Sequence, residues 1–463
     1  MNTLILTTIL GLLCMVMEIF NLRKLLVPVL IAGLCAVFYV NYTGWELLAP
    51  VSVGGINMDH MMQVDHFSMA FSALSIFLTA MIILMGSDFY RNEQHHLSDY
   101  LSIIVFILCG TLVLFSFNNL AMLFLGIEIV SISLYIMAGS KRFDLRSNEA
   151  GFKYFLMGAF ASGFLLFGIA LVYGSTGSFE LAKISTYVED GNLSPLFYAG
   201  CLLIIIALLF KVAAVPFHFW SPDVYEGSPA LVTALMSTLV KVSLFAAFYR
   251  LLENGFFGAY AFTTPILMWV TAATLILGNL TALFQENFKR MLAYSGISHA
   301  GYMLMGVMSM PAQSESALFF YASAYAIASI GVFAVAIPVF LAQRNEGVNA
   351  FNGLGKRNPL LAALLTICML SVAGIPPFAG FLAKYYIFSQ AFQSEMFGIT
   401  LLAVITSIIA VYYYFRVIVA MYTKEPNDTE VKPAPVYWIV LWICVALSIV
   451  LGIFPDSLMQ LLS

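Results

Sequence analysis

Long apolar segments separated by short polar ones follow one another along the whole chain. Each segment has roughly 20 mostly apolar residues, which is the length that an α-helix needs to cross a bilayer. Most of them look continuous, whereas two are interrupted by proline. We predict membrane spans at residues 4–20, 25–40, 67–86, 101–117, 120–138, 154–173, 196–219, 230–252, 264–283, 291–308, 317–342, 360–391, 398–421 and 436–454.

The composition agrees with this pattern. Of the 463 residues, 62% are hydrophobic and only 10% are charged, whereas a soluble domain is about a quarter charged. Fourteen spans of about 20 residues would occupy about 60% of the chain. The sequence therefore predicts an all-α polytopic membrane protein with about 14 transmembrane helices, built as a single membrane domain over residues 1–463. The first segment lacks a basic start and a small-residue cleavage site, so we expect it to be retained as a span.

The positions of the 20 Lys and Arg residues predict the orientation. Cytoplasmic loops of membrane proteins are enriched in these residues. With the N-terminus outside, only Lys183 and Arg250 fall on the outer side, and both termini lie there. The inner loops and membrane edges then hold fourteen: Arg23, Lys24, Arg91, Lys141, Arg142, Arg146, Lys289, Arg290, Arg344, Lys356, Arg357, Arg416, Lys424 and Lys432.

The other four lysines lie in or at the edge of predicted spans: Lys153, Lys211, Lys241 and Lys384. Lys241 is twelve residues after Pro229, or about 18 Å along a helix and close to mid-bilayer. Glu128, nine residues after Asn119, lies at a similar depth.

A charge at a helix centre costs about 2.5–3.5 kcal/mol on insertion scales, so such groups usually face the bundle interior and line ion or proton routes. One interpretation is a structural ion pair between Glu128 and a lysine, but one acid cannot neutralise three or four lysines. Because a buried lysine can gain or lose a proton as nearby charges move, the pattern favours a proton relay.

Proline breaks form a second signal. "KVAAVPFHFWSP" and "SVAGIPPFAGFLAKYYIF" each combine proline, aromatic residues and a lysine, and they lie five spans apart. Broken helices at corresponding positions are typical of inverted repeats with an ion site at the break. The alternative is a simple proline kink, which is common in membrane helices but is less favoured when both kinks carry a lysine at the same repeat position. We predict two inverted five-helix repeats, each with a broken helix. The expected parts are the first three spans (1–96), a first repeat (97–252), a second repeat (260–422) and a last span (436–455).

Three stretches carry a family resemblance: "LLFKVAAVPFHFWSPDVYEGSPALVTALMSTLVKVSLF", "YSGISHAGYMLMG" and "AGIPPFAGFLAKYYIF". They resemble the antiporter-like membrane subunits of respiratory complex I, a proton-pumping NADH–quinone oxidoreductase, and of multisubunit cation/proton antiporters. The resemblance covers essentially the whole chain. "GFKYFLMGAFASGFLLFGIALVYGSTGS" is most similar to the N-type members.

The resemblance implies a proton path through this chain. Its members pair a fifth-span glutamate with a seventh-span lysine, and lysines of the eighth and twelfth spans continue the path. The matching residues, with the histidine of the tenth-span block and the sixth-span lysine, are Glu128, Lys211, Lys241, Lys384, His299 and Lys153. Three of these residues have an alternative role: a polar contact between helices for His299, an interfacial anchor for Lys153 and a side chain extended to the interface for Lys384. His218 is either a proton-entry group or an interfacial aromatic residue.

The resemblance also implies partners. The drive would come from quinone reduction in other complex I subunits, which would hold NADH, FMN, iron–sulfur clusters and quinone. We expect neighbouring antiporter-like and small membrane subunits beside this chain, in the inner membrane of a bacterium, and no nucleic acid.

We expect no cofactor or metal in this chain. The six cysteines are scattered without a C-x-x-C pair, and iron–sulfur clusters need clustered thiolates. A G-x-G-x-x-G dinucleotide motif is also absent from the sequence. The competing functions are a subunit of a cation/proton antiporter and a scaffold whose charges only hold helices together. A small-solute permease is less favoured.

Overall fold

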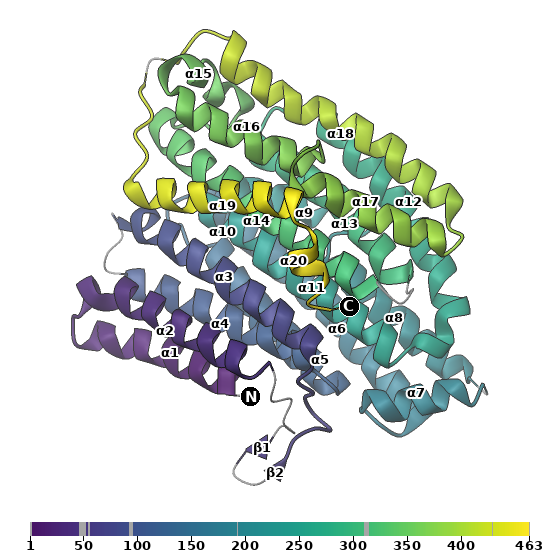
Figure 1. Cartoon of the computed structure of the whole chain (residues 1–463). Helices are drawn as coiled ribbons and strands as arrows, with labels where there is room; N and C mark the ends of the chain where they lie inside the picture. The colour runs from purple at the N-terminus through teal and green to yellow at the C-terminus, as the bar shows by residue number, and fades with distance from the viewer. Residues whose placement is uncertain are drawn as a thin grey trace.

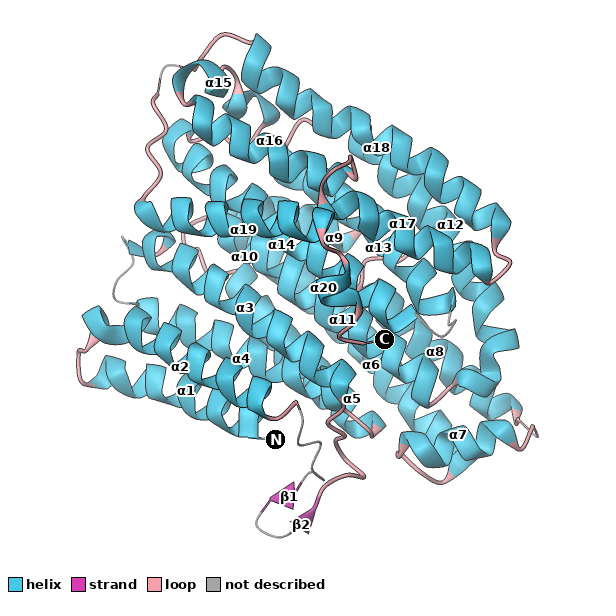
Figure 2. Cartoon of the chain, viewed as in Figure 1, coloured by secondary structure: helices cyan, strands magenta, loops and turns pink. Residues whose placement is uncertain are grey.

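The computed structural model describes residues 2–45, 52–53, 56–91, 96–191, 193–309, 314–427 and 429–462. Nearly all of this is helical, and a two-residue hairpin pairs β1 (Ser52–Val53) with β2 (Ile56–Asn57) in antiparallel fashion (Figure 2). The α-helices are α1 (Asn2–Ile19), α2 (Arg23–Thr43), α3 (His66–Phe89), α4 (Leu97–Ser116), α5 (Leu120–Ala138), α6 (Leu145–Thr176), α7 (Leu181–Glu189), α8 (Pro195–Lys211), α9 (Trp220–Gly227), α10 (Ala230–Leu235), α11 (Lys241–Asn254), α12 (Tyr260–Leu283), α13 (Phe288–Ser309), α14 (Ser314–Gln343), α15 (Leu354–Arg357), α16 (Pro359–Ala373), α17 (Ala379–Gln393), α18 (Phe397–Thr423), α19 (Pro435–Ile453) and α20 (Asp456–Met459). Short turns of other helical types are η2 (Met236–Val240), η3 (Phe257–Ala259) and η4 (Val348–Phe351).

The all-helical membrane architecture is confirmed. Each of the fourteen predicted segments contains helix, and eleven helices within the described ranges are long and apolar enough to cross a membrane. Two shorter apolar helices, α8 and α16, belong to the predicted broken segments. The count of fourteen membrane crossings stays a prediction.

Burial distinguishes the centre of the bundle from its edges. The elements α10, η2 and α11 form one continuous helix over residues 230–254. In its most apolar stretch all residues are buried (100%), and in that of α14 94% are buried, whereas in α1 and α2 only 28% are. In Figure 1, α1 and α2 (purple) lie at one side of the molecule beside α4 and α3, and α18 (yellow-green) lies at the far side. The helix that carries Lys241 therefore runs through the core and is not exposed to lipid.

Both predicted helix breaks are present, and they have the same geometry. After α8 the chain turns at Ala213 (φ 58°), and the N–H of Ala214 donates to the carbonyl of Leu209 at 2.9 Å. After α16 it turns at Gly374 (φ 83°), and the N–H of Ile375 donates to the carbonyl of Leu370 at 3.0 Å. In both turns the residue after the left-handed one donates a backbone hydrogen bond to the carbonyl five positions earlier. This arrangement is the Schellman motif that ends many helices.

The chain leaves each Schellman turn through a proline. The Val215–Pro216 and Pro376–Pro377 bonds are both cis. The chain then re-enters helix, as α9 after the first break and as α17 after the second. The matched breaks agree with a repeated architecture; the boundaries of the two repeats stay a prediction.

Candidate functional site

Lys211 is the last residue of α8 and lies less than a tenth exposed at the first break. Its Nζ donates hydrogen bonds to Ser131 Oγ at 2.9 Å, to Tyr135 Oη at 3.3 Å and to Ser162 Oγ at 3.3 Å. An ammonium has three N–H donors, so these contacts give one acceptor to each. The apolar surroundings of Lys211 therefore contain a complete polar cradle, supplied by α5 and α6.

The cradle is built by helical spacing. Glu128, Ser131 and Tyr135 are separated by three and four positions on α5, which places them on one helix face. On α6, Gly158 leaves room for the tyrosine, because a Cβ there would lie 2.0 Å from Tyr135 Oη. Ser162 follows one helical turn later.

Glu128 and Lys211 are linked through a third residue. The Ser162 hydroxyl donates a hydrogen bond to Glu128 Oε1 and accepts one from Lys211. Among the ion pairs between described residues, none joins Glu128 directly to Lys211. The expected glutamate–lysine pair is thus present as a serine-bridged arrangement.

Lys241 begins α11, directly after the π-helical turn η2. Single π turns inside α-helices are frequent at functional sites. The Nζ of Lys241 donates to the carbonyl oxygen of Gly296 on α13 and lies 5.8 Å from the ring centroid of Tyr325. The side chain is only 5% exposed, which confirms that it is enclosed by the bundle.

His299 joins three helices in the same region. Its Nδ1 lies 2.7 Å from Tyr321 Oη on α14, and its Nε2 lies 3.2 Å from Tyr414 Oη on α18. Tyr414 is in turn hydrogen-bonded to Ser295, one turn before His299 on α13. Since a neutral imidazole donates at one nitrogen and accepts at the other, this residue can receive a proton on one side and release one on the other.

Lys384 lies at the second break, although it belongs to the helix after it. Its Nζ donates to the carbonyl oxygen of Ala373, the last residue of α16, at 2.7 Å. Cations at helix C-termini are favoured by the helix dipole. The Nζ also lies 5.1 Å from the ring centroid of Tyr302, whose ring packs against His299. At 5% exposure, Lys384 does not extend to an interface.

Lys153 lies in a different cluster. Its Nζ contacts Glu149 at 2.7 Å and Asp223 at 3.0 Å, and Arg290 contacts Asp223 at 2.7 Å and Glu226 at 3.0 Å. The Lys153 side chain is 41% exposed. Among the described residues, no hydrogen bond or ion pair joins Lys153 to Lys211 or Glu128, so the structure places Lys153 in an ion cluster that ties α6, α9 and α13 together.

Asp223 is the centre of this ion cluster and lies outside the predicted spans. Burial by itself would raise the pKa of its carboxyl group. Hydrogen bonds from Arg290 and Lys153, together with their positive charges, outweigh burial and hold this pKa below its ordinary value. Asp223 is therefore a firmly ionised anchor.

A cavity of about 1000 Å³ adjoins this cluster. Its lining includes Glu226, Lys141, Lys289 and Glu346, on the side predicted to be cytoplasmic. Lys289 is buried there, with its Nζ 2.8 Å from both the Ser228 carbonyl oxygen and the Glu346 carboxylate. His218, in the break before α9, is also buried, and its Nδ1 lacks a hydrogen-bond partner among the described residues.

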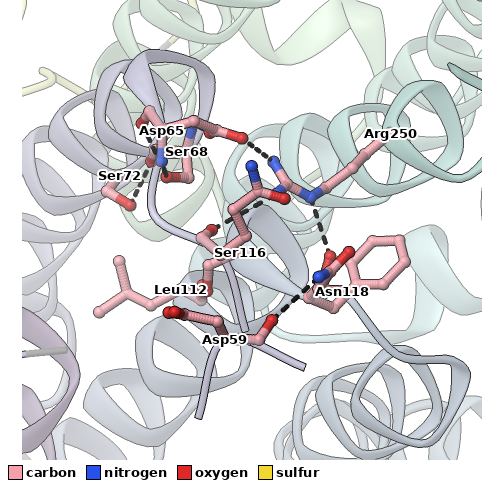
Figure 3. Close-up of polar contacts among 10 residues, drawn as sticks. Asp59, Asp65, Ser68, Ser72, Leu112, Ser116, Asn118 and Arg250 are labelled. Atoms are coloured by element: carbon pink, nitrogen blue, oxygen red, sulfur yellow. Dashed lines mark hydrogen bonds and ion pairs between the residues drawn. The ribbon is translucent and has the colours of Figure 1, made fainter. Parts of the chain in front are cut away.

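A second polar cavity of about 750 Å³ lies at the other end of the helix 230–254. Arg250 lines this cavity and is only 2% exposed. From the sequence it was expected only at the outer edge of the membrane. The guanidinium donates to Asp65 Oδ2 at 2.8 Å and to the carbonyl oxygens of Phe117 at 2.9 Å and Gln63 at 3.3 Å. Figure 3 shows Arg250 reaching Asp65, whose carboxylate also caps α3 through Ser68.

Several residues of the site had not been singled out from the sequence: Ser131, Tyr135, Ser162, Ser295, Tyr302, Tyr321, Tyr325 and Tyr414. A signal existed for two of them, because Ser131 and Tyr135 repeat the helical spacing of Glu128. Within the described ranges, the His, Cys, Asp and Glu side chains form no group of three or more suited to a metal ion.

Comparisons with known proteins place the chain in a family. The family "NADH:quinone oxidoreductase/Mrp antiporter, TM" matches residues 117–410. NADH-quinone oxidoreductase subunit N of Flavobacterium psychrophilum is 47% identical over 462 residues, covering 100% of both chains. A chain of respiratory complex I from Thermus thermophilus with bound aureothin has a TM-score of 0.84 at 30% identity, covering 100% of this chain and 99% of that one.

A chain of the Mrp complex from Dietzia sp. has a TM-score of 0.87 at 20% identity, covering 99% of this chain and 95% of that one. At that identity the likeness shows a shared fold. The full-length match at 47% identity is to subunit N. The chain therefore belongs to the NADH:quinone oxidoreductase/Mrp antiporter membrane-subunit family and, within it, to NADH-quinone oxidoreductase subunit N.

Proposed function

We propose that this chain is a proton-translocating membrane subunit of a bacterial NADH–quinone oxidoreductase. The observation that carries the proposal is the series of buried titratable groups Lys211, Lys241, His299 and Lys384 through the bundle. Buried charges in membrane bundles are expensive and are characteristic of proton routes. Each of the four has polar partners on a neighbouring helix or across a helix break, as a relay requires.

In this proposal, protons enter from the cytoplasmic side, through the cavity of about 1000 Å³ beside α9 and α10. Lys211 and Lys241 hold and relay them. His299 passes them through its two tyrosine contacts towards Lys384, from which they leave to the outside. Lys153 serves the entry side through its ion cluster with Asp223.

Glu128 acts as the switch in this scheme. When it is close, it favours the protonated form of Lys211; when its influence is withdrawn, the proton can leave. The drive comes from quinone reduction in partner subunits, which hold the NADH, FMN, iron–sulfur and quinone sites. The proposed location is the bacterial inner membrane, with both termini on the periplasmic side and the domain divided into two inverted repeats.

The test uses the complete oxidoreductase reconstituted in liposomes. Lys211→Met and Lys241→Met should lower proton pumping per NADH oxidised to near background while the complex stays assembled. Lys424→Met is the control, because Lys424 is exposed and does not line the entry cavity. Unchanged pumping in assembled Lys211→Met and Lys241→Met complexes would support the scaffold function instead.

The matched family also includes Mrp antiporters, which supports a second candidate, a subunit of a cation/proton antiporter driven by ion gradients. Purification with the natural neighbours separates the two. Co-purifying flavin and iron–sulfur subunits support the oxidoreductase. A complex of membrane subunits alone supports the antiporter.

A further inference from the structure

Glu128, Ser162 and Lys211 form a continuous hydrogen-bonded series across three helices. The Ser162 hydroxyl has one hydrogen, which points to Glu128 Oε1, and its free lone pair accepts an N–H of Lys211. A serine hydroxyl can donate and accept at the same time. Here Ser162 accepts a hydrogen bond from the Lys211 amine and donates one to the Glu128 carboxylate, so the two bonds run in the same direction.

We propose that Ser162 carries the proton between Lys211 and Glu128. Lys211 gives one ammonium proton to Ser162 Oγ as Ser162 gives its hydroxyl proton to Glu128 Oε1. One N–H bond and one O–H bond break, and two O–H bonds form. The products are a neutral amine, a restored serine and a neutral carboxylic acid, so charge and atoms balance. This inference rests on the proton-translocating function proposed above.

The partners of Lys211 fit both states of the transfer. Before it, the three ammonium N–H groups face Ser131, Tyr135 and Ser162. Afterwards the amine keeps two N–H groups, enough for Ser131 and Tyr135, and its lone pair accepts the new hydrogen of Ser162. The cradle therefore needs no rearrangement when the proton moves.

The transfer also suits apolar surroundings. It converts a separated pair of opposite charges into two neutral groups, and in a medium of low polarity both states are accessible. A charge that approaches from a neighbouring subunit can then shift the balance. Ser131 and Tyr135 contact Lys211, but no hydrogen bond between described residues joins either to Glu128. Ser162 is thus the residue through which the two titratable groups meet.

The test compares Ser162→Thr with Ser162→Val in the complete oxidoreductase. The two variants have nearly the same volume and shape, and only threonine keeps the hydroxyl. Any effect of crowding against α5 is therefore common to both. We expect Ser162→Thr to retain most proton pumping per NADH oxidised and Ser162→Val to lose at least about tenfold in the pumping rate, equivalent to ~1.4 kcal/mol in the barrier.

A second measurement reads the proton itself. Infrared difference spectra during turnover should contain a carboxylic-acid C=O band that disappears in Glu128→Gln. We expect this band in the wild type and in Ser162→Thr, and its absence in Ser162→Val. Ser175→Val on the same helix is the matched control, because the only hydrogen bond of the Ser175 hydroxyl to a described residue is to the backbone carbonyl of Val172; pumping in this variant should stay unchanged.

The outcomes separate the two levels of the proposal. If Lys211→Met leaves pumping intact, the proposed function fails. If Lys211→Met abolishes pumping while Ser162→Val equals Ser162→Thr in both rate and infrared band, the proton does not pass through Ser162 and the inference is overturned. If Ser162→Val fails to assemble, the infrared band of Glu128 in wild-type complex decides, since its absence under turnover contradicts transfer to this carboxylate.

Discussion

The ammonium of Lys384 and the carbonyl oxygen of Ala373 are joined by a hydrogen bond of 2.7 Å that crosses the second helix break. The lysine thus belongs to α17, but its charge lies at the end of α16. This relationship depends on the turn between the two helices. Gly374 occupies that turn with φ 83°, and a Cβ added there would lie 2.8 Å from Lys384 Cδ.

Gly374→Ala should therefore displace Lys384. The left-handed conformation adds a cost of about 1–3 kcal/mol for a residue other than glycine. We expect proton pumping to fall severalfold more than NADH oxidation, measured in reconstituted complex. Gly163→Ala is the control, since a Cβ at Gly163 contacts nothing within 4 Å. Equal pumping in the two variants would contradict a role for the position of this ammonium.

His299 should depend on its two tyrosine hydroxyls. Tyr321→Phe and Tyr414→Phe each remove one partner of the imidazole and leave the ring in place. Each lost buried hydrogen bond costs about 1–3 kcal/mol. We expect each variant to slow pumping, and the double variant to match His299→Phe. Pumping is measured with the assembled complex. Wild-type pumping in the double variant would leave His299 as a contact between helices only.

Arg250 should contribute more to stability than any exposed arginine. Its removal leaves Asp65 and two carbonyl groups without their partner, and each lost buried hydrogen bond costs about 1–3 kcal/mol. We expect Arg250→Met to lower the unfolding temperature of the detergent-solubilised protein clearly. Arg142→Met, at an exposed site, should change it little. Arg250→Lys should not restore the wild-type value, because an ammonium cannot reproduce the guanidinium fork. A similar fall in unfolding temperature in Arg250→Met and Arg142→Met would contradict a stabilising role for the contacts of Arg250 with Asp65, Phe117 and Gln63.

The ion cluster at Asp223 should make stability depend on pH in a defined direction. A carboxyl whose pKa is lowered by folding stabilises the protein above its ordinary pKa of 3.8, and this contribution disappears as the pH falls through the lowered value. Because Asp223 is more than a third exposed, the effect is at most about 1 kcal/mol.

Wild type should therefore unfold at a higher temperature than Asp223→Asn at neutral pH, and the difference should shrink in acid below the ordinary pKa. Thermal melts across this pH range measure it. A difference that grows as the pH falls would have the wrong sign for a depressed carboxyl pKa. Asp190→Asn is the control, because Asp190 is exposed and no ion pair involving it is formed among the described residues.

Membrane helices and their breaks could be predicted because their signals are local. Apolar length predicts a span, and proline followed by a return to apolar residues predicts the break between α16 and α17. The lysines at the breaks could be found for the same reason, since a charge in an apolar run stands out in the sequence alone.

The partners of those lysines could not be predicted in the same way. Ser162 meets Glu128 and Lys211 only because α6 packs between α5 and α8, and single serines and tyrosines are common in apolar helices. Arg250 was expected at an outer edge, whereas the packing of α11 buries it against the start of α3. The π turn before Lys241 also depends on packing and has no distinct sequence pattern here.

The two Schellman turns give the halves of the chain a common reference point. Ten positions after the left-handed residue, the second half has Lys384 and the first half has Asp223. In the second half, Lys384 joins α17 to the C-terminal end of α16. In the first half, Asp223 joins α9 to α6 and α13 through Lys153 and Arg290. The two breaks therefore share a backbone geometry but differ in chemistry, with an acid after the first and a base after the second, so a proton that follows the proposed path would meet unlike surroundings at the two breaks.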